Sequence, residues 1–359
     1  MKTDWQRAQR LGKIAAMTST PTTPPRPFDV TTVFPALAPL ARTATRLHPR
    51  PGAPSPHESS IGGPLLWPAD EPWPHCDEPH EVDGINPALS PAEVRLERRI
   101  RAASRGRTLT PQEQETLDKI RPPQEYPVTL AITHYEGPIA MLPVAQLYAR
   151  DVPDLHTPAG ADLLQVLWCP FDHTAGMPKT ALFWRSAASV TDILPAPPEP
   201  PAMQFDGYLP EPCLLNPERV TEYPDRRELS KELQQQIGDW SLWQAAQTGV
   251  DSAYAPYPQE FYDLELSVAP GWRVGGWPRW GAADPSPLRC PTCDSDMDAL
   301  LTIATFEGAT NSSWFPHREP AHDPSLGFNH TAVQIGSGYS QQLYVCRTAP
   351  EHAHIELMG

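Results

Sequence analysis

The apolar residues of this chain fall mainly into short runs that predict β-strands. These runs cover residues 127–133, 163–168, 180–184 and 262–268, and each is shorter than a typical helix. The strands are mixed with a few helices and show no regular strand–helix–strand alternation. The pattern therefore predicts an α+β fold with mixed or antiparallel sheets.

A longer stretch, residues 225–247, has a different pattern. Leu229, Leu233, Ile237 and Trp240 follow one another at spacings of four, four and three residues. These spacings place the four side chains on one face of a helix. We therefore predict a helix over this stretch.

Two start signals predict a helical hairpin inserted between residues 90 and 120. Residues 90–93 read Ser-Pro-Ala-Glu, which combines an N-cap serine, a proline in the first turn and a capping-box glutamate; residues 110–113, Thr-Pro-Gln-Glu, repeat the signal. Gly106 lies between them, and several arginines follow the first signal. We interpret the segment as a solvated helix pair, with a docking arm as the functional alternative.

Two parts of the chain resemble each other and indicate an internal duplication. Residues 62–76 and 275–290 both contain Gly-Gly, then aromatic and proline residues, Ala-Asp, further prolines and a cysteine. Residues 164–169 and 342–346 both read as apolar strands that end in a cysteine. The repeat predicts two related halves, residues 60–215 and 216–359, and places the two cysteines of each half close together.

The residues before these halves have a different composition. Residues 18–59 are rich in proline, threonine, serine and alanine, with spaced arginines. We therefore expect residues 1–59 to form an N-terminal arm that is flexible or loosely packed.

The cysteines and histidines of the repeat predict two zinc sites. The first half has two Cys-x-x-x-His pairs, and the second half has a Cys-x-x-Cys knuckle, a third cysteine and nearby histidines; thiolates and neutral imidazoles are the ligands that zinc prefers. His352 is chosen over His354 because the repeat makes it the counterpart of His173. The predicted sites are Cys76, His80, Cys169 and His173 in the first half, and Cys290, Cys293, Cys346 and His352 in the second.

Other interpretations of these residues remain open at the sequence level. The cysteines could be ordinary buried residues and the histidines ordinary surface residues, chiefly His80 and His352. Water or His354 could also replace His352 as the fourth ligand. The sixth cysteine, Cys213, is expected to be a small buried apolar residue.

Composition and charge narrow the classes of function. The 359 residues include 47 prolines, which argue against a helical bundle, and 11 tryptophans, which are enough for a core. The formal net charge is −15. The negative charge disfavours nucleic acids and anionic membranes as partners and favours basic proteins or simple solubility. Because we identify no signal peptide and no membrane-spanning run, we expect a cytoplasmic protein whose cysteines are not paired in disulfides.

The motifs at the two ends of the chain resemble the YwqG-like family of bacterial proteins of unknown function. The resemblance rests on Gly-Gly-Trp-Pro at residues 275–278, on the knuckle from Cys290 to Cys293 with Met297 and Leu300-Leu301 after it, and on the terminal strand ending in Cys346. Residues 60–74 resemble the N-terminal signature of the family. The resemblance covers most of the chain from about residue 60 onward.

This resemblance implies an α+β fold and a role as an immunity or interaction protein, without an established activity. Family members with a zinc knuckle tend to carry a second Cys-x-x-Cys at the last strand. This chain departs from that pattern, because Ala349 stands where the second cysteine would be.

No catalytic constellation is evident in the sequence. It contains no phosphate-binding glycine loop, no nucleophile elbow and no His-Glu-x-x-His motif. Two metal sites with four protein ligands each would leave no position for water and would be structural. We therefore expect a zinc-stabilised, non-enzymatic binding protein, with toxin neutralisation as its candidate task and a basic toxin as its candidate partner. The alternatives are a metal-dependent hydrolase with one open zinc site and a nucleic-acid adaptor that uses the arginine-rich hairpin.

Overall fold

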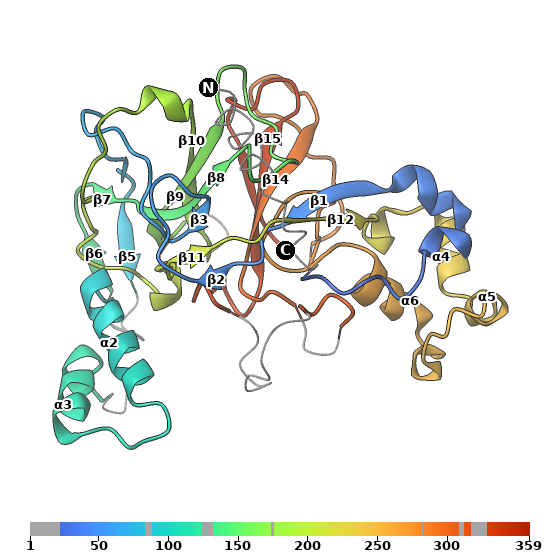
Figure 1. Ribbon diagram of the computed structural model, residues 1–359, viewed down its shortest axis with the longest axis horizontal. Helices are drawn as coiled ribbons and strands as arrows, with labels where there is room; N and C mark the ends of the chain where they lie inside the picture. Colours follow the sequence, from blue (N-terminus) through green and yellow to red (C-terminus); the bar gives the residue numbers. More distant parts are fainter. Residues whose placement is uncertain are drawn as a thin grey trace, which may run out of the picture.

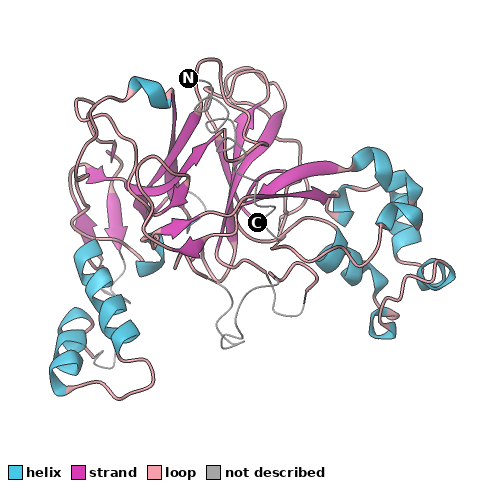
Figure 2. Cartoon of the chain, viewed as in Figure 1, coloured by secondary structure: helices cyan, strands magenta, loops and turns pink. Residues whose placement is uncertain are grey.

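The computed structural model describes residues 22–82, 88–123, 132–173, 176–281, 283–308, 312–316 and 329–359. Two six-stranded antiparallel sheets form the middle of the molecule (Figure 1). Most of the helices lie at its two ends (Figure 2). The fold is α+β, as the sequence predicts. Among the described residues, no helix has both the length and the apolar character that crossing a membrane requires.

The first sheet contains the long strands of the first half. In order across the sheet, its strands are β10 (Pro178–Arg185), β9 (Leu163–Asp172), β8 (Leu142–Tyr148), β3 (Ser60–Ile61), β11 (Cys213–Leu214) and β2 (Arg50–Pro51). Four short strands make two separate ladders beside this sheet. They are β4 (His75–Cys76) with β7 (Ile139–Ala140), and β5 (His80–Val82) with β6 (Thr133–Tyr135).

The second sheet contains the long strands of the second half. Its strands, in order, are β16 (Ile355–Met358), β15 (Ser340–Cys346), β14 (Met297–Ala304), β13 (Arg273–Gly275), β1 (Arg42–Arg46) and β12 (Glu218–Glu222). In both sheets a three-stranded meander, β8–β10 or β14–β16, has as its next neighbour a strand that leads into a Gly-Gly pair: β3 ends just before Gly62, and β13 ends on Gly275. The predicted strands at residues 163–168 and 180–184 are confirmed as parts of β9 and β10.

The two meanders also have the same register. A shift interrupts the pairing of β8 with β9 between Pro143 and Ala145, and a shift interrupts β14 and β15 between Ala299 and Leu301. Beyond the shift, Ala145 pairs with Val166 and Leu301 pairs with Leu343. In each sheet the partner residue lies three positions before the cysteine of its strand. The cysteines therefore occupy matching places in the two sheets.

When strands β1–β10 and strands β11–β16 are compared as two series in chain order, the first strand of each series lies in the sheet of the other series. β1 precedes the first half but pairs on both sides in the second sheet, with β12 and β13. β11 follows β10 in the chain and pairs in the first sheet with β2 and β3. This exchange ties the two sheets together through the backbone.

The expectation of a flexible or loosely packed arm is wrong for β1. Arg46, its last residue, is fully buried. The guanidinium of Arg46 donates hydrogen bonds to the carbonyl oxygens of Glu307 and Trp314 and to Thr23 Oγ1. These hydrogen bonds offset much of the cost of burying the guanidinium, and partners so distant in sequence cannot be read from the local composition.

The two sheets share one hydrophobic core. Val166 and Trp168 of β9 belong to the same buried cluster as Ile303 of β14 and Leu343 of β15. A fully buried apolar side chain contributes about 1.5–3 kcal/mol, so this cluster supplies much of the stability of both halves. The halves are therefore packed as one body.

The helical hairpin is confirmed. It consists of α2 (Pro91–Ala103) and α3 (Pro111–Ile120), and it projects at the lower left of Figure 1. The side chains of Ser90 and Thr110 each accept a hydrogen bond from the backbone N–H of the glutamate three residues later, and the carboxylate of each glutamate accepts one from the backbone N–H of its N-cap residue. Both capping boxes are therefore complete, because the residues that make them are adjacent in sequence.

A second group of helices lies at the other end of the molecule (Figure 1). The helix predicted at residues 225–247 is divided, because Gly238 ends its first part and Asp239 caps a new helix by accepting from the backbone N–H of Ser241. The strand predicted at residues 262–268 is wrong, since most of this stretch is helical. The elements are α4 (Lys231–Ile237), α5 (Trp240–Ala245), α6 (Pro258–Phe261) and a π-helix (Tyr262–Leu266).

The remaining regular elements are short 3-10 turns. They are η1 (Val30–Thr32), η2 (Pro35–Leu40), η4 (Ala187–Ser189), η5 (Asp206–Tyr208), η6 (Arg226–Glu228) and η7 (Ser252–Tyr254). The strand predicted at residues 127–133 lies almost entirely outside the described residues, and Thr133 is the first residue of β6.

Candidate metal centres

The first Cys/His cluster forms where three strands of the first half end. Cys76 is the last residue of β4 and His80 is the first residue of β5. Cys169 lies on β9, and His173 directly follows that strand. The short ladders beside the first sheet thus bring the two Cys-x-x-x-His pairs to one point.

The four side chains of this cluster are close enough to share one ion. Each can offer a ligand atom that lies within 4.8 Å of the other three. His80 Nε2 is 3.1 Å from Cys169 Sγ, and His173 Nε2 is 3.7 Å from Cys76 Sγ. Both cysteines and His80 are buried, so His80 is not an ordinary surface histidine.

Aromatic and charged groups surround the first cluster. Trp67 and Trp73 pack against each other with ring centroids 5.0 Å apart, in the same buried cluster as Cys76 and Cys169. These rings therefore pack around the site. On the other side, His173 Nδ1 lies 2.8 Å from Glu78 Oε2, and Glu78 forms an ion pair with Lys179.

Hydrogen bonds favour an ionised cysteine in this cluster. Hydrogen bonds with the Cys169 thiol and with His173 hold the pKa of Cys76 well below its ordinary value. Burial opposes this shift but is the weaker effect. The contact with Cys76 also raises the pKa of His173. A thiolate beside imidazoles is the donor set that a soft divalent cation requires. The Glu78 carboxylate would orient His173 through its second nitrogen.

The second cluster is built on a tight turn that precedes β14. The backbone N–H of Cys290 donates to Ser295 O, and the N–H of Asp294 donates back to Cys290 O. Asp294 has a φ of 60°, a left-handed conformation that asparagine and aspartate tolerate better than most residues. Met297 pairs with Cys346 across β14 and β15, so the turn lies at the end of β15.

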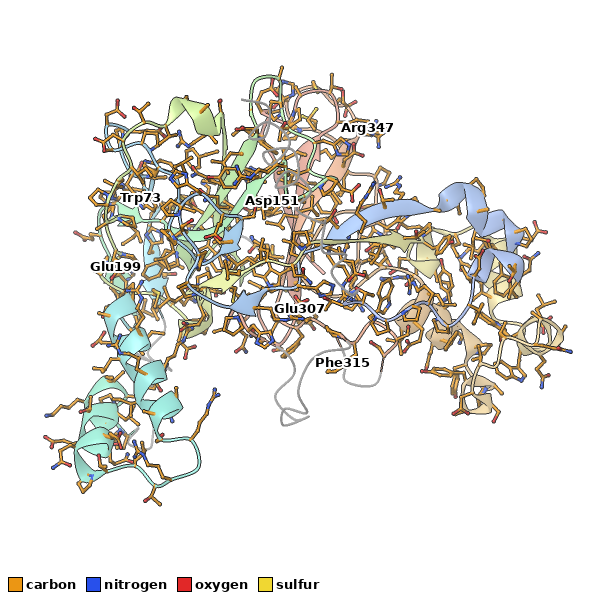
Figure 3. All side chains as sticks on the ribbon, viewed as in Figure 1. Trp73, Asp151, Glu199, Glu307, Phe315 and Arg347 are labelled. Atoms are coloured by element: carbon orange, nitrogen blue, oxygen red, sulfur yellow. The ribbon has the colours of Figure 1, made fainter. Side chains whose placement is uncertain are left out.

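This turn brings the predicted ligands of the second half together. Cys293 Sγ is 3.5 Å from Cys346 Sγ, and Cys290 Sγ is 3.6 Å from His352 Nδ1. The four ligand atoms again lie within 4.8 Å of one another. Cys290 and Cys346 are buried and Cys293 is exposed. In Figure 3, Trp73, which packs with Cys76, and Arg347, which follows Cys346, lie in different parts of the molecule.

Local donors favour thiolates at two of the three cysteines of the second cluster, Cys290 and Cys293, whereas burial raises the pKa of Cys346. The backbone N–H of Thr292 donates to Cys290 Sγ at 3.4 Å. Hydrogen bonds from the side chain and the backbone N–H of Ser295 lower the pKa of Cys293. Contact with Cys290 raises the pKa of His352. The turn thus supplies positive dipoles to sulfur atoms that must be deprotonated to bind a metal.

The structure distinguishes the two histidines that compete for the fourth position. His352 Nδ1 faces Cys290, whereas His354 Nε2 lies 2.8 Å from Thr180 Oγ1 and 3.3 Å from Glu356 Oε1. His354 therefore contributes to the contact between β10 and β16. His352 is the histidine that joins the cluster, as the repeat predicts.

Cys213, Trp277 and Trp280 lie outside the two clusters. Cys213 is fully buried, as expected, and burial raises its pKa to about 12. Trp280 is buried, and Trp277 donates its ring N–H to Leu40 O with Arg42 stacked 3.5 Å from its ring centroid. These tryptophans serve packing.

No protein-family model matches the chain, and a search of curated proteins returned no match. The function is therefore inferred from the two Cys/His clusters and their surroundings. Sequence reasoning missed two neighbours of the ligands, Glu78 and Ser295. Each lies two residues from a predicted ligand, and that proximity was the available signal.

Proposed function

We propose that each Cys/His cluster holds one structural zinc ion and that the chain is a non-enzymatic binding protein. The observation that carries the proposal is the completeness of both sets, because each offers four ligand atoms within 4.8 Å of one another. Four protein ligands satisfy tetrahedral zinc and leave no position for a reacting water. The bound ion would supply folding free energy and no chemistry.

The donor types select the metal. The first set has two thiols and two imidazoles, and the second has three thiols and one imidazole. Both combinations are typical of structural zinc, while calcium and magnesium prefer oxygen ligands. Thiolate ligands require a reducing compartment, which supports a cytoplasmic location.

The matching topology supports an internal duplication. The two sheets have the same strand order, the same register shift and a cysteine at the same distance from that shift. A single ancestral unit, duplicated with exchange of its first strand, explains all three features and agrees with the sequence repeat. The resemblance to the YwqG-like family remains part of this proposal.

Binding a protein partner is the role that best fits an acidic protein of this kind. The net charge of −15 would speed the capture of a basic partner. Toxin neutralisation is the specific role that we propose, with a basic toxin as the partner.

Metal analysis of the purified chain tests the proposal. We expect two zinc ions per chain and no hydrolytic activity on ester, phosphoester or peptide substrates. A metal content of zero in protein purified under reducing conditions would refute the structural sites. Activity that a chelator abolishes and zinc restores would instead favour the hydrolase alternative.

A further inference from the structure

The six cysteines, all of which lie in the described part of the chain, differ in their access to solvent. Cys293 is exposed, and the other five are buried. Within the second cluster, 3% of Cys290 and 0% of Cys346 is exposed. The turn gives Cys293 no cover, since residues 291–294 are all exposed. Cys293 is therefore the cysteine that a dissolved reagent can reach.

Packed rings close the first cluster against the same reagent. The ring centroids of His80 and Phe171 are 4.8 Å apart, and those of Tyr135 and Phe171 are 5.1 Å apart. Phe171 belongs to the same buried cluster as Cys76 and Cys169. The first cluster is thus a shielded counterpart of the second within one molecule.

A second sulfur atom lies next to Cys293 in the buried part of its cluster. Cys346 Sγ, at the end of β15, is 3.5 Å from Cys293 Sγ, although the two residues are 53 positions apart in sequence. The sulfur atoms of a disulfide are about 2 Å apart, so a shift of roughly 1.5 Å would join this pair. Cys290 is engaged elsewhere, because its Sγ accepts the backbone N–H of Thr292 at 3.4 Å and faces His352 Nδ1 at 3.6 Å. Cys346 is therefore the thiol placed to react with an oxidised Cys293.

We propose that Cys293 is a site of reversible oxidation, at which a hydroperoxide joins Cys293 to Cys346 and so releases the ion of the second cluster, while the first cluster keeps its own. The inference rests on the proposed zinc sites and adds a regulation to them. One site maintains the fold under all conditions, and the other responds to oxidants.

The reaction has two steps. The Cys293 thiolate attacks one oxygen of hydrogen peroxide, the O–O bond breaks, and the hydroxide that leaves takes a proton from solvent, so that Cys293 becomes a sulfenic acid. The Cys346 thiolate then attacks the Cys293 sulfur, the S–O bond breaks, and a second hydroxide leaves and is protonated. Two thiolates thus lose two electrons, the peroxide gains them, and the products are one disulfide and two waters.

The disulfide removes half of the ligand set. Cys290 and His352 would be the ligands that remain, and two ligands do not complete a tetrahedral zinc site. The new bond keeps the turn attached to the end of β15. Reduction by a dithiol should therefore restore the cluster and its capacity for zinc.

Treatment of the zinc-loaded full chain with hydrogen peroxide tests the proposal. Zinc is counted per chain before and after treatment, and a chromogenic chelator follows its release. Trypsin digestion without reduction should then link the peptides of residues 290–318 and 319–347, and tandem mass spectrometry should assign the bond to Cys293 and Cys346. We expect one of two zinc ions to be released with the appearance of this disulfide, and dithiothreitol with added zinc to return the count to two.

The matched control is Cys213→Ser, which removes the sixth thiol outside both clusters and should leave the release of one ion unchanged. A disulfide between Cys76 and Cys169, a disulfide between Cys290 and Cys293, or release of both ions together would overturn the proposal. Two ions that survive peroxide would overturn this inference alone. A reduced chain that carries no zinc before treatment would instead refute the proposed structural sites, and the inference with them.

Discussion

The turn that holds Cys290 and Cys293 should depend on its metal more than any other described segment. Among the described residues from 283 to 296, Cys290 is the only buried one. The substitution Cys290→Ser removes one of the four ligands and changes the side-chain volume little. We expect it to release the second zinc ion and to unfold the turn.

The magnitude follows from the contacts of the turn. Fixing residues 288–296 costs about 9–18 kcal/mol of backbone entropy at 1–2 kcal/mol per residue. The backbone hydrogen bonds of Cys290, Asp294 and Met297 return about 2–5 kcal/mol, and burial of one cysteine adds little. The remaining cost is about 4–16 kcal/mol, and the binding free energy of a structural zinc ion, about 10–16 kcal/mol, is large enough to offset it.

Zinc content, thermal unfolding and limited trypsin digestion measure this effect. Cys290→Ser should carry one zinc ion per chain, melt at a lower temperature and be cleaved after Arg289, which is exposed within the turn. Cys213→Ser is the control, because Cys213 is buried but belongs to neither cluster. If Cys290→Ser keeps two zinc ions and the melting temperature of the parent chain, the assignment of the second cluster is wrong.

Three further predictions concern other parts of the structure. Glu78→Ala should lower zinc affinity at the first cluster about 10–100-fold in chelator competition, since it removes the partner of His173. The control Glu81→Ala, at an exposed position of β5, should leave the zinc affinity unchanged. An equal loss of affinity in both variants would contradict the orienting role of Glu78. Ser90→Ala should lower the free energy of unfolding by about 1 kcal/mol in urea, because it removes half of a capping box; an unchanged urea midpoint would contradict this. Burial opposes ionisation of Glu218, but hydrogen bonds from His48 and Thr23 lower its pKa from 4.5 to about 2. The carboxylate thus stabilises the fold above pH 4.5, and the advantage of the parent chain over Glu218→Gln should disappear as the pH falls from 4.5 to 2; a gap that persists at pH 2 would exclude this origin.

Local sequence patterns predicted the helical hairpin and much of the grouping of cysteines and histidines in the two clusters, because the determinants of these features are close together in sequence. A capping box needs residues three positions apart, and a Cys-x-x-Cys turn brings two sulfurs to one side without help from the rest of the chain. The proximity of Cys76 and Cys169 was predicted from the sequence repeat. Matching positions in the two repeated parts indicate contacts between residues that are far apart in sequence.

The strand predicted at residues 262–268 failed for a reason that involves distant residues. Phe261 stacks edge-on against Trp243 with centroids 5.7 Å apart, and Tyr262 donates its hydroxyl to Pro224 O. These contacts favour a helix that starts at Pro258, and they override the β-propensity of the segment. The alternation of apolar residues alone could not reveal them.

The sequence alone determined the α+β class, the hairpin and the residue types that gather in each cluster, because periodicity, caps and ligand spacing act over a few residues. Only the tertiary structure decided that β1 and β11 cross to opposite sheets and that Arg46 is buried. It also showed that His352, and not His354, faces the second cluster. The sheet exchange and the burial of Arg46 depend on groups separated by more than a hundred residues. The position of the two histidines depends on which of them contacts β10. No local sequence pattern encodes such contacts.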